Sequence, residues 1–138
     1  MNADRHIVKK TKMDLTPQHI NAITEKVIGC AYKVSNKLGS GFLEKVYENA
    51  LALEIQMAGL KVEQQHPIHI YYEGTIVGDY TSDLLVEGCV IIEVKTVTAI
   101  NIIHQAQCMN YLKATGLQVC LLVNFYNCLL YTSPSPRD

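Results

Sequence analysis

The fold of this chain is decided by two short stretches, Ser82-Asp83-Leu84-Leu85-Val86 and Ile91-Ile92-Glu93-Val94-Lys95. Both are apolar runs of strand length, and the Glu87-Gly88 pair between them suits a hairpin turn. Side chains alternate between the two faces of a strand, so Glu93 and Lys95 point the same way while their apolar neighbours point the other way. The pattern predicts that Asp83, Glu93 and Lys95 lie close together on two adjacent strands.

This group of ionisable side chains has the chemistry of a metal site. Two carboxylates about 4 Å apart repel by about 4 kcal/mol at an effective dielectric constant of about 20. A divalent cation between them removes the repulsion, and hard oxygen ligands suit Mg²⁺ or Mn²⁺. Taken singly, Asp83 is more simply a solvent-facing residue or a turn cap, and Glu93 with Lys95 a surface ion pair. A structural ion network of all three residues is a further alternative.

The length and composition fit one globular domain with one core. The chain has 138 residues, of which 49% are hydrophobic and 18% are charged. A formal net charge of −1 argues against a basic surface that coats DNA non-specifically, although it allows a local basic groove. No apolar run approaches the length of a membrane span, and residues 1–13 are polar and basic, so we expect a cytoplasmic protein without membrane contact.

Five cysteines are scattered through the sequence without a C-x-x-C pair: Cys30, Cys89, Cys108, Cys120 and Cys128. Their neighbours are apolar, so we interpret them as small core residues. An odd number without framework spacing is typical of reduced thiols in the cytosol, and a zinc site is the alternative.

Both ends of the chain differ from the domain that we place at residues 16–127. Residues 1–15 are basic with little apolar content and predict a flexible arm. Residues 128–138, with two prolines and small polar residues, do not match the preceding strand and resemble translated sequencing-adapter sequence. We therefore hypothesise that the natural C-terminus is replaced beyond about Asn127; a genuine disordered tail is the alternative.

Helical periodicity dominates the first part of the domain. Thr16 suits the N-cap of a helix that begins at Pro17 and ends at Gly39, with apolar residues every three or four positions. We expect a second helix from about Phe42 to Ala58, stopped by Gly59. Its predicted core stripe consists of Phe42, Val46, Ala50, Leu53 and Met57, with Glu44, Tyr47 and Leu51 on a neighbouring face.

After Gly59 the periodicity changes to that of strands. A third helix is expected from Ile102 to Ala114, after an Asn101 N-cap, and a final apolar strand from Gln118 to Phe125, flanked on both sides. Earlier strands are predicted at Lys61–Gln65, Ile68–Glu73, Ile76–Val86 and Cys89–Val97. The sequence therefore predicts an α/β fold with a mixed β-sheet flanked by helices.

Gln107 and Tyr111 lie four residues apart on the predicted third helix and so share a face. Their amide and phenol groups can hydrogen-bond a phosphate oxygen, a water molecule or Lys95. A polar rim on an amphipathic helix is the simpler alternative.

The combined pattern resembles a known superfamily of nucleases. Asp83 followed by Glu93-Val94-Lys95 is similar to the Asp…Glu-x-Lys arrangement of the PD-(D/E)XK nuclease superfamily. Gln107 with Tyr111 resembles the additional motif of its RecB-like branch. The stretch Gly41-Phe42-Leu43-Glu44-Lys45-Val46-Tyr47 fits Gly-x-x-Glu-x-x-Tyr, and residues 18–125 resemble the GxxExxY family of this superfamily. The resemblance implies a restriction-endonuclease-like core and a metal-dependent nuclease acting on nucleic acid, most simply on DNA.

The resemblance also implies a set of metal ligands. Asp83 and Glu93 hold Mg²⁺ or Mn²⁺, with the Val94 carbonyl as a third protein ligand. Glu44 matches a helix glutamate that commonly reaches the metal in the superfamily, and it completes the shell directly or through water.

Three further residues are expected to act on the reacting groups. Lys95 positions or deprotonates the attacking water, while the metal stabilises charge in the transition state. Gln107 and Tyr111 orient Lys95 or the scissile phosphate.

The chain departs from the family pattern at two places, and the missing arginine, together with the near-neutral charge, favours a competing function. Family members often carry an arginine just before the aspartate segment, where this chain has Thr81-Ser82. Family members also continue into another basic strand at the place where this chain has the unusual tail. We therefore expect an incomplete sheet edge beside the strand that ends at Asn124-Phe125. The alternative function is a non-catalytic module that binds nucleic acid or protein and retains the nuclease fold.

Overall fold

The computed structural model describes residues 16–126 and 129–134. The arm predicted at residues 1–15, together with Cys128 and residues 135–138 of the tail, lies outside the described residues. The elements, in chain order, are α2 (Pro17–Leu38), α3 (Glu44–Met57), β1 (Val62–Tyr72), β2 (Thr75–Val86), β3 (Val90–Lys95), α4 (Ile102–Thr115), β4 (Val119–Asn124) and β5 (Leu129–Pro134).

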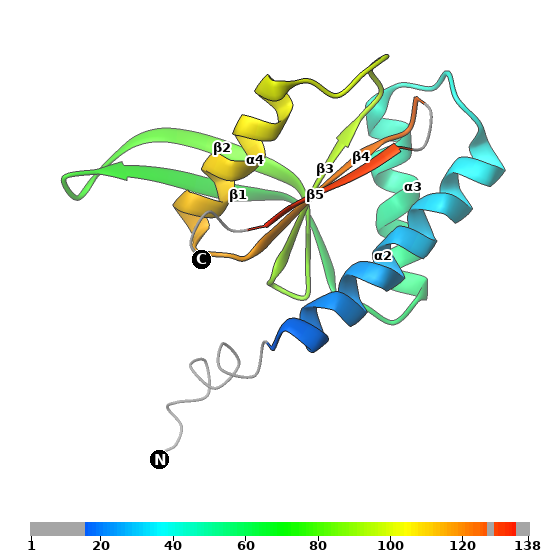
Figure 1. Cartoon of the computed structure of the whole chain (residues 1–138), viewed down its shortest axis with the longest axis horizontal. Helices are drawn as coiled ribbons and strands as arrows, with labels where there is room; N and C mark the ends of the chain where they lie inside the picture. Colours follow the sequence, from blue (N-terminus) through cyan, green and yellow to red (C-terminus); the bar gives the residue numbers. More distant parts are fainter. Residues whose placement is uncertain (1–15, 127–128, 135–138) are drawn as a thin grey trace.

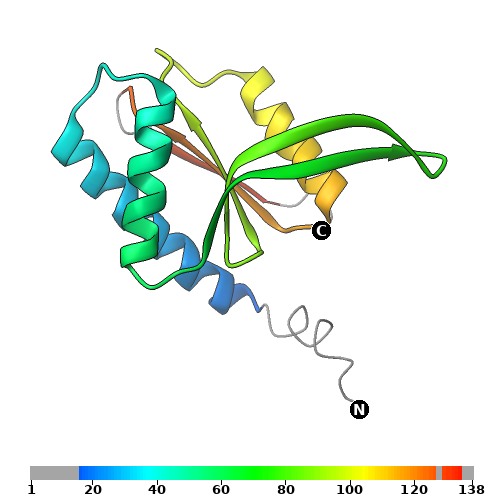
Figure 2. The same cartoon turned by 180° about the vertical axis from the view of Figure 1, so that it is seen from behind.

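The five strands form one mixed sheet in the order β1-β2-β3-β4-β5. Neighbouring strands are antiparallel except β3 and β4, which are parallel and joined through α4. Helices α2 and α3 cover one face of the sheet and α4 covers the other (Figures 1 and 2). The apolar core is accordingly split into a larger cluster under α2 and α3 and a smaller one under α4. The predicted α/β fold with a mixed sheet flanked by helices is confirmed.

Helix α2 has the boundaries that the sequence predicts. The Thr16 hydroxyl accepts a hydrogen bond from the His19 N–H at 3.1 Å. Pro17 is in the first turn, where a backbone N–H would have no intrahelical acceptor, so its lack of an N–H costs no hydrogen bond. Gly39 ends the helix with φ of 69°, a value that residues with a Cβ rarely adopt. The buried positions are Ile20, Ile23, Val27, Cys30, Ala31 and Val34.

The core stripe predicted for α3 is wrong. Leu53 and Met57 are 55% and 65% exposed, and Phe42 and Val46 also face solvent. The helix instead buries Tyr47, Leu51 and Ile55 completely. Both faces of α3 carry apolar residues at helical spacing, so periodicity alone does not choose between them. Contacts with the sheet decide, because the Tyr47 ring stacks on Phe125 with ring centroids 4.7 Å apart.

The β1–β2 hairpin departs from the predicted strands at one point. Lys61–Gln65 and Ile68–Glu73 were expected as separate strands, but β1 runs through both of them. Pro67 is tolerated because β1 is an edge strand, where a missing N–H removes no bond within the sheet. The turn at Glu73-Gly74 forms as predicted, with φ of 51° and 80°.

The segment predicted to be an atypical tail contains a strand. Residues Leu129–Pro134 form β5, which pairs antiparallel with β4 along its whole length. The disordered tail considered as an alternative is therefore wrong for these residues, and the incomplete edge expected beyond Asn124 is covered by β5. Strand β4 is flanked on both sides, as predicted. The adapter-like origin of residues 128–138 stays a hypothesis.

The described cysteines are buried, free thiols, in agreement with their interpretation as core residues: Cys30, Cys89, Cys108 and Cys120. Across residues 16–126 and 129–134, no helix is long and apolar enough to cross a membrane.

The orientation of α3 generates a stability prediction. Replacing buried Ile55 with alanine should lower the free energy of unfolding by about 2–5 kcal/mol, because it leaves a cavity against the sheet. The matched control Leu53→Ala, two residues away on the exposed face, should cost less than about 1 kcal/mol. Urea unfolding of both variants measures the difference, and a larger loss for Leu53→Ala would contradict this orientation.

Candidate active site

The candidate site begins where strands β2 and β3 separate. Their ladder ends at the pair Leu84 and Ile92, so Asp83 and Glu93, next in register, are not joined by a backbone bond. The Asp83 N–H instead donates to Glu93 Oε2 at 3.0 Å, and the Val94 N–H donates to Asp83 Oδ2 at 2.7 Å. Each carboxylate thus satisfies a backbone group of the other strand. This exchange holds both acids in fixed positions at the fork.

Burial gives the two acids unusual protonation behaviour. Loss of hydration, followed by the charge of Asp83, raises the pKa of Glu93 to about 8. Burial also raises the pKa of Asp83, against the opposing hydrogen bond from Val94. The Lys95 ammonium lies near enough to favour the charged form of both carboxylates, although its effect is smaller. The structure therefore brings Asp83, Glu93 and Lys95 into one cluster.

The Val94 carbonyl points into the same fork. The Lys95 carbonyl accepts a hydrogen bond from Phe125 N–H at 2.8 Å, which directs the Lys95 peptide toward β4. Neighbouring residues in a strand direct their backbone groups to opposite sides, so those of Val94 point toward β2, as its bond to Asp83 shows. Beyond the end of the β2–β3 ladder, this carbonyl is suited to bind an ion.

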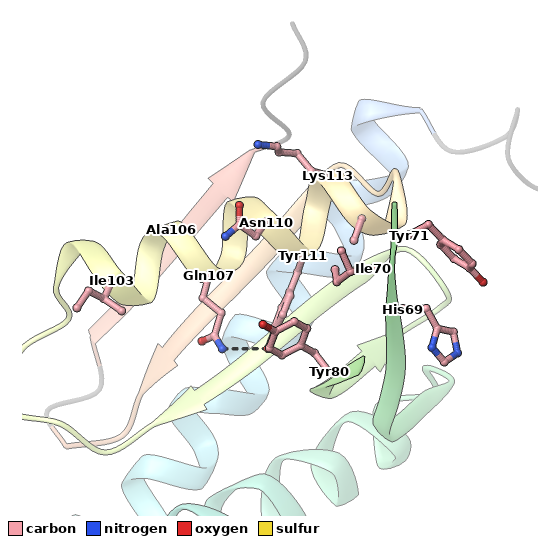
Figure 3. Close-up of a pocket in the computed structure, with 11 residues that line it drawn as sticks. His69, Ile70, Tyr71, Tyr80, Ile103, Ala106, Gln107, Asn110, Tyr111 and Lys113 are labelled. Carbon is pink, nitrogen blue, oxygen red and sulfur yellow. Dashed lines mark hydrogen bonds between the residues drawn. The ribbon is translucent and has the colours of Figure 1, made fainter. Parts of the chain in front are cut away.

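On α4, Gln107 and Tyr111 lie beside Asp83 and Glu93. The Gln107 Nε2 donates to the Tyr111 hydroxyl at 3.0 Å (Figure 3). Tyr111 is only 4% exposed, and its burial, followed by the charges of Glu93 and Asp83, raises its pKa to about 12. The phenol therefore keeps its proton and can donate a hydrogen bond close to the two carboxylates.

Glu44 reaches a neighbouring position. It is the first residue of α3. Its Oε2 accepts a hydrogen bond at 3.2 Å from the N–H of Thr96, the residue that follows Lys95. Its exposed side chain thus anchors the loop that follows β3. Tyr47, the last residue of the Gly-x-x-Glu-x-x-Tyr motif, donates to the Gly39 carbonyl at 2.6 Å and accepts from Phe42 N–H. The side chains of Glu44 and Tyr47 therefore anchor the loop after β3 and the loop before α3, respectively.

Glu48 is the acidic residue of α3 whose charge acts on the site, and the sequence analysis did not select it. It is 4% exposed, and its charge raises the pKa of both Asp83 and Glu93, behind burial as the main cause. Lys45 Nζ binds its carboxylate at 3.1 Å. Glu48 stands four residues after Glu44 on the Tyr47 face. That spacing is a signal for Glu48, but the sequence pattern placed the core stripe on the neighbouring face.

Gln65 joins Glu48 to the fork. Its φ of 54° interrupts the regular strand opposite Asp83, and its Nε2 lies 3.1 Å from both Glu48 oxygens. The same nitrogen lies 3.5 Å from Asp83 Oδ1. The Thr81 hydroxyl donates to Gln65 Oε1 at 3.1 Å and so orients the side-chain amide. At the position where an arginine was expected, this chain therefore has a residue that supports the acidic cluster.

Asn124, like Glu48 and Gln65, is a residue that the sequence analysis missed. It is fully buried and lies opposite Lys95 in the register of β3 and β4. Its side chain accepts a hydrogen bond from Val97 N–H at 3.1 Å and donates one to the Val97 carbonyl at 2.8 Å. Asn124 thus fixes the chain just after Lys95. A lone asparagine at the end of an apolar strand gives no sequence signal of this role.

The donor set fits a hard divalent cation. In the described part of the chain, no group of three or more His, Cys, Asp and Glu side chains is placed to hold a metal ion. Mg²⁺ needs fewer, because it usually keeps several waters and binds one or two carboxylates together with substrate phosphates. Asp83, Glu93 and the Val94 carbonyl offer such oxygens. The raised pKa of buried Glu93 shows that its charge lacks full compensation within the protein.

Glu93 should make the stability of the metal-free protein depend on pH. Its pKa is about 8 in the folded protein against an ordinary 4.5, so between these values the unfolded chain binds fewer protons than the folded one. The free energy of unfolding should therefore fall as the pH rises from about 4.5 to about 8.

We expect Glu93→Gln to raise the free energy of unfolding by about 1–3 kcal/mol at pH 8 and to change it little at pH 4.5. Urea unfolding without divalent ions measures this, with Glu25→Gln on the exposed face of α2 as the matched control. An effect of equal size at both pH values would contradict the burial of an uncompensated carboxylate.

Known proteins resemble this chain in sequence and in fold. A profile of the PD-(D/E)XK nuclease superfamily, whose members generally use divalent metals, matches residues 21–133. No curated protein matches the sequence. The chain resembles an alkaline exonuclease (LHK-Exo) from Laribacter hongkongensis with 18% identity and a TM-score of 0.48, over 93% of this chain and 74% of that chain.

A second solved structure, that of SSO0001, is similar with 16% identity and a TM-score of 0.42, over 84% of this chain and 67% of that chain. The profile match covers most of the sequence and includes the strands that bear Asp83, Glu93 and Lys95. This chain therefore belongs to the PD-(D/E)XK nuclease superfamily.

Proposed function

We propose that this protein is a metal-dependent phosphodiesterase that hydrolyses DNA. The observation that carries the proposal is the fork between β2 and β3, where reciprocal backbone bonds fix Asp83 and Glu93 beside Lys95. A fixed acid pair, with Glu93 buried and Asp83 partly buried, is costly for stability next to a lysine and useful for hydrolysis. Superfamily membership supports nucleic acid as the substrate class.

We further assign the protein to the GxxExxY family and the RecB-like branch. Two contacts support this assignment. Tyr47 of the Gly-x-x-Glu-x-x-Tyr motif fastens the loop before α3, and Gln107 is bonded to Tyr111 beside the acids. The buried thiols of the described cysteines support a reducing, cytoplasmic compartment.

Asp83, Glu93 and the Val94 carbonyl would hold Mg²⁺ or Mn²⁺. When bound, the ion would act as a Lewis acid and stabilise the charge that develops on the phosphate. Lys95, on the same face as Glu93, orients the attacking water or accepts its proton. The protonated Tyr111 hydroxyl, held by Gln107, donates a hydrogen bond to a phosphate oxygen.

The two α3 carboxylates take different positions in this proposal. Glu48 supports the acid pair through Gln65 and would stand behind the residues that hold the ion. Glu44, which the sequence analysis placed in the metal shell, holds the Thr96 backbone and so fixes Lys95 from the next residue.

Replacing Lys95 tests the chemistry directly. We expect Lys95→Ala to lose about 10²–10⁴-fold in the rate of DNA cleavage while it binds Mn²⁺ as the wild type does, since an ammonium group is not a metal ligand. Cleavage of labelled DNA with Mg²⁺ or Mn²⁺ and titration with Mn²⁺ give the two measurements. The matched control is Lys26→Ala, on the exposed face of α2.

Unchanged cleavage by Lys95→Ala would show that the activity arises elsewhere. If the wild type shows no metal-dependent cleavage although it binds DNA, the non-catalytic binding module replaces the nuclease function.

The roles of Glu48 and Glu44 can be separated by paired amide variants. Glu48→Gln should lower Mn²⁺ affinity or cleavage about 10- to 100-fold, because residues that support metal ligands typically have effects of this size. Glu44→Gln should change both less than about threefold, because the glutamine oxygen can still accept the Thr96 N–H. The reverse order of effects would return Glu44 to the metal shell.

A further inference from the structure

A cavity of about 700 Å³ lies next to the candidate active site, between α4 and the β1–β2 hairpin. Figure 3 shows its lining, with Ile70 and Tyr80 from the hairpin on the same side of α4 as Gln107 and Tyr111. Asn110 and Lys113 of α4 also line the cavity. Its volume is in the range of pockets that bind small organic groups. Asp83, Glu93 and Lys95 are not among its lining residues. The cavity is therefore a separate site that shares a wall with the acid cluster.

Tyr80 provides an aromatic surface in this cavity. Its side chain is 52% exposed, whereas its neighbour Tyr111 is only 4% exposed. The two ring centroids are 5.9 Å apart and the rings are tilted by 52°, so Tyr111 supports Tyr80 without covering its faces. Ala106 and Ala114 of α4, whose side chains are small, also line the cavity. A flat aromatic group can stack on Tyr80 in such a space.

The polar groups of the cavity suit a nucleobase with its backbone. The Asn110 amide offers both donors and acceptors to the edge of a base. The Lys113 ammonium, which is exposed on α4, can contact a phosphate. Lys113 is the one lysine or arginine among the described residues that line the cavity. Duplex binding draws on many phosphate contacts, so stacking on an unpaired base is the better match.

Tyr111 connects the cavity with the acid cluster. Its ring lines the cavity, while its hydroxyl is bonded to Gln107 and is affected by the charges of Glu93 and Asp83. A DNA strand with one phosphate at the fork would therefore place a neighbouring nucleotide beside Tyr80.

We propose that this cavity binds an unpaired base of single-stranded DNA by stacking on Tyr80. The position of that base next to a scissile phosphate rests on the proposed function. The cavity thereby gives the site a preference for single strands over duplex.

The test measures stacking and affinity together. The probe is a twelve-nucleotide oligo-dT strand carrying one 2-aminopurine, titrated with protein in Ca²⁺ to suppress cleavage, beside the matching duplex. We expect Tyr80→Ala to bind the single strand about 5- to 150-fold more weakly, the effect of losing one stacked base. Tyr80→Phe, which keeps the ring, should bind within about twofold of the wild type and quench the 2-aminopurine fluorescence as strongly.

Tyr32→Ala is the matched control, since Tyr32 is 48% exposed on α2, across the sheet from the cavity. It should bind the single strand as the wild type does. The thermal unfolding midpoints of all variants establish that they are folded. Equal single-strand affinity of Tyr80→Ala and wild type, or an equal loss for single strand and duplex, overturns the inference.

Cleavage with Mg²⁺ distinguishes this inference from the proposed function. If single-strand binding depends on Tyr80 but neither the wild type nor any variant cleaves DNA, the base site stands and the hydrolytic function fails. If the wild type cleaves DNA while Tyr80→Ala binds and cleaves single strands equally well, the hydrolytic function stands and the base site fails.

Discussion

The fork between β2 and β3 is the constraint on which the candidate site depends. Buried backbone N–H groups need acceptors, and where the ladder ends no strand supplies them. The Asp83 and Glu93 carboxylates take this role for each other's strands. The exchange joins structure and chemistry, because the same bonds that satisfy the backbone also aim two acids at one point. A substitution of either acid therefore affects strand pairing as well as the ion site that we propose.

The cost of this arrangement is an acid pair whose fully charged form the protein alone does not compensate. Burial and mutual repulsion keep Glu93 protonated near neutral pH, with a pKa of about 8. Glu48 adds further negative charge, while Lys95 offsets only part of it. Such a cluster destabilises the metal-free fold and favours a bound cation. Sites of this kind illustrate how function is retained at the expense of stability.

Rigid neighbours hold the fork in place. Asn124 and Glu44 fix the chain immediately after Lys95 from two different elements, β4 and α3. Gln65, in a strained backbone conformation, brings Glu48 and Asp83 to one amide group. On α4, the bond between Gln107 and Tyr111 forms the wall shared with the Tyr80 cavity. The candidate chemistry and the proposed base site are thus parts of one supported surface.

The sequence by itself determined what short-range physics controls. The Thr16 cap and Gly39 set the ends of α2, the Glu73-Gly74 turn set a hairpin, and strand alternation placed Glu93 with Lys95. Tertiary structure decided what depends on distant partners. The buried face of α3 is set by packing of Tyr47 on Phe125, which lies far along the chain. The same orientation of α3 sets the position of Glu48. The continuity of β1 and the pairing of β5 likewise depend on neighbouring strands. The physical reason is that periodicity shows only which residues share a face, whereas the burial of a residue is set by what packs against it.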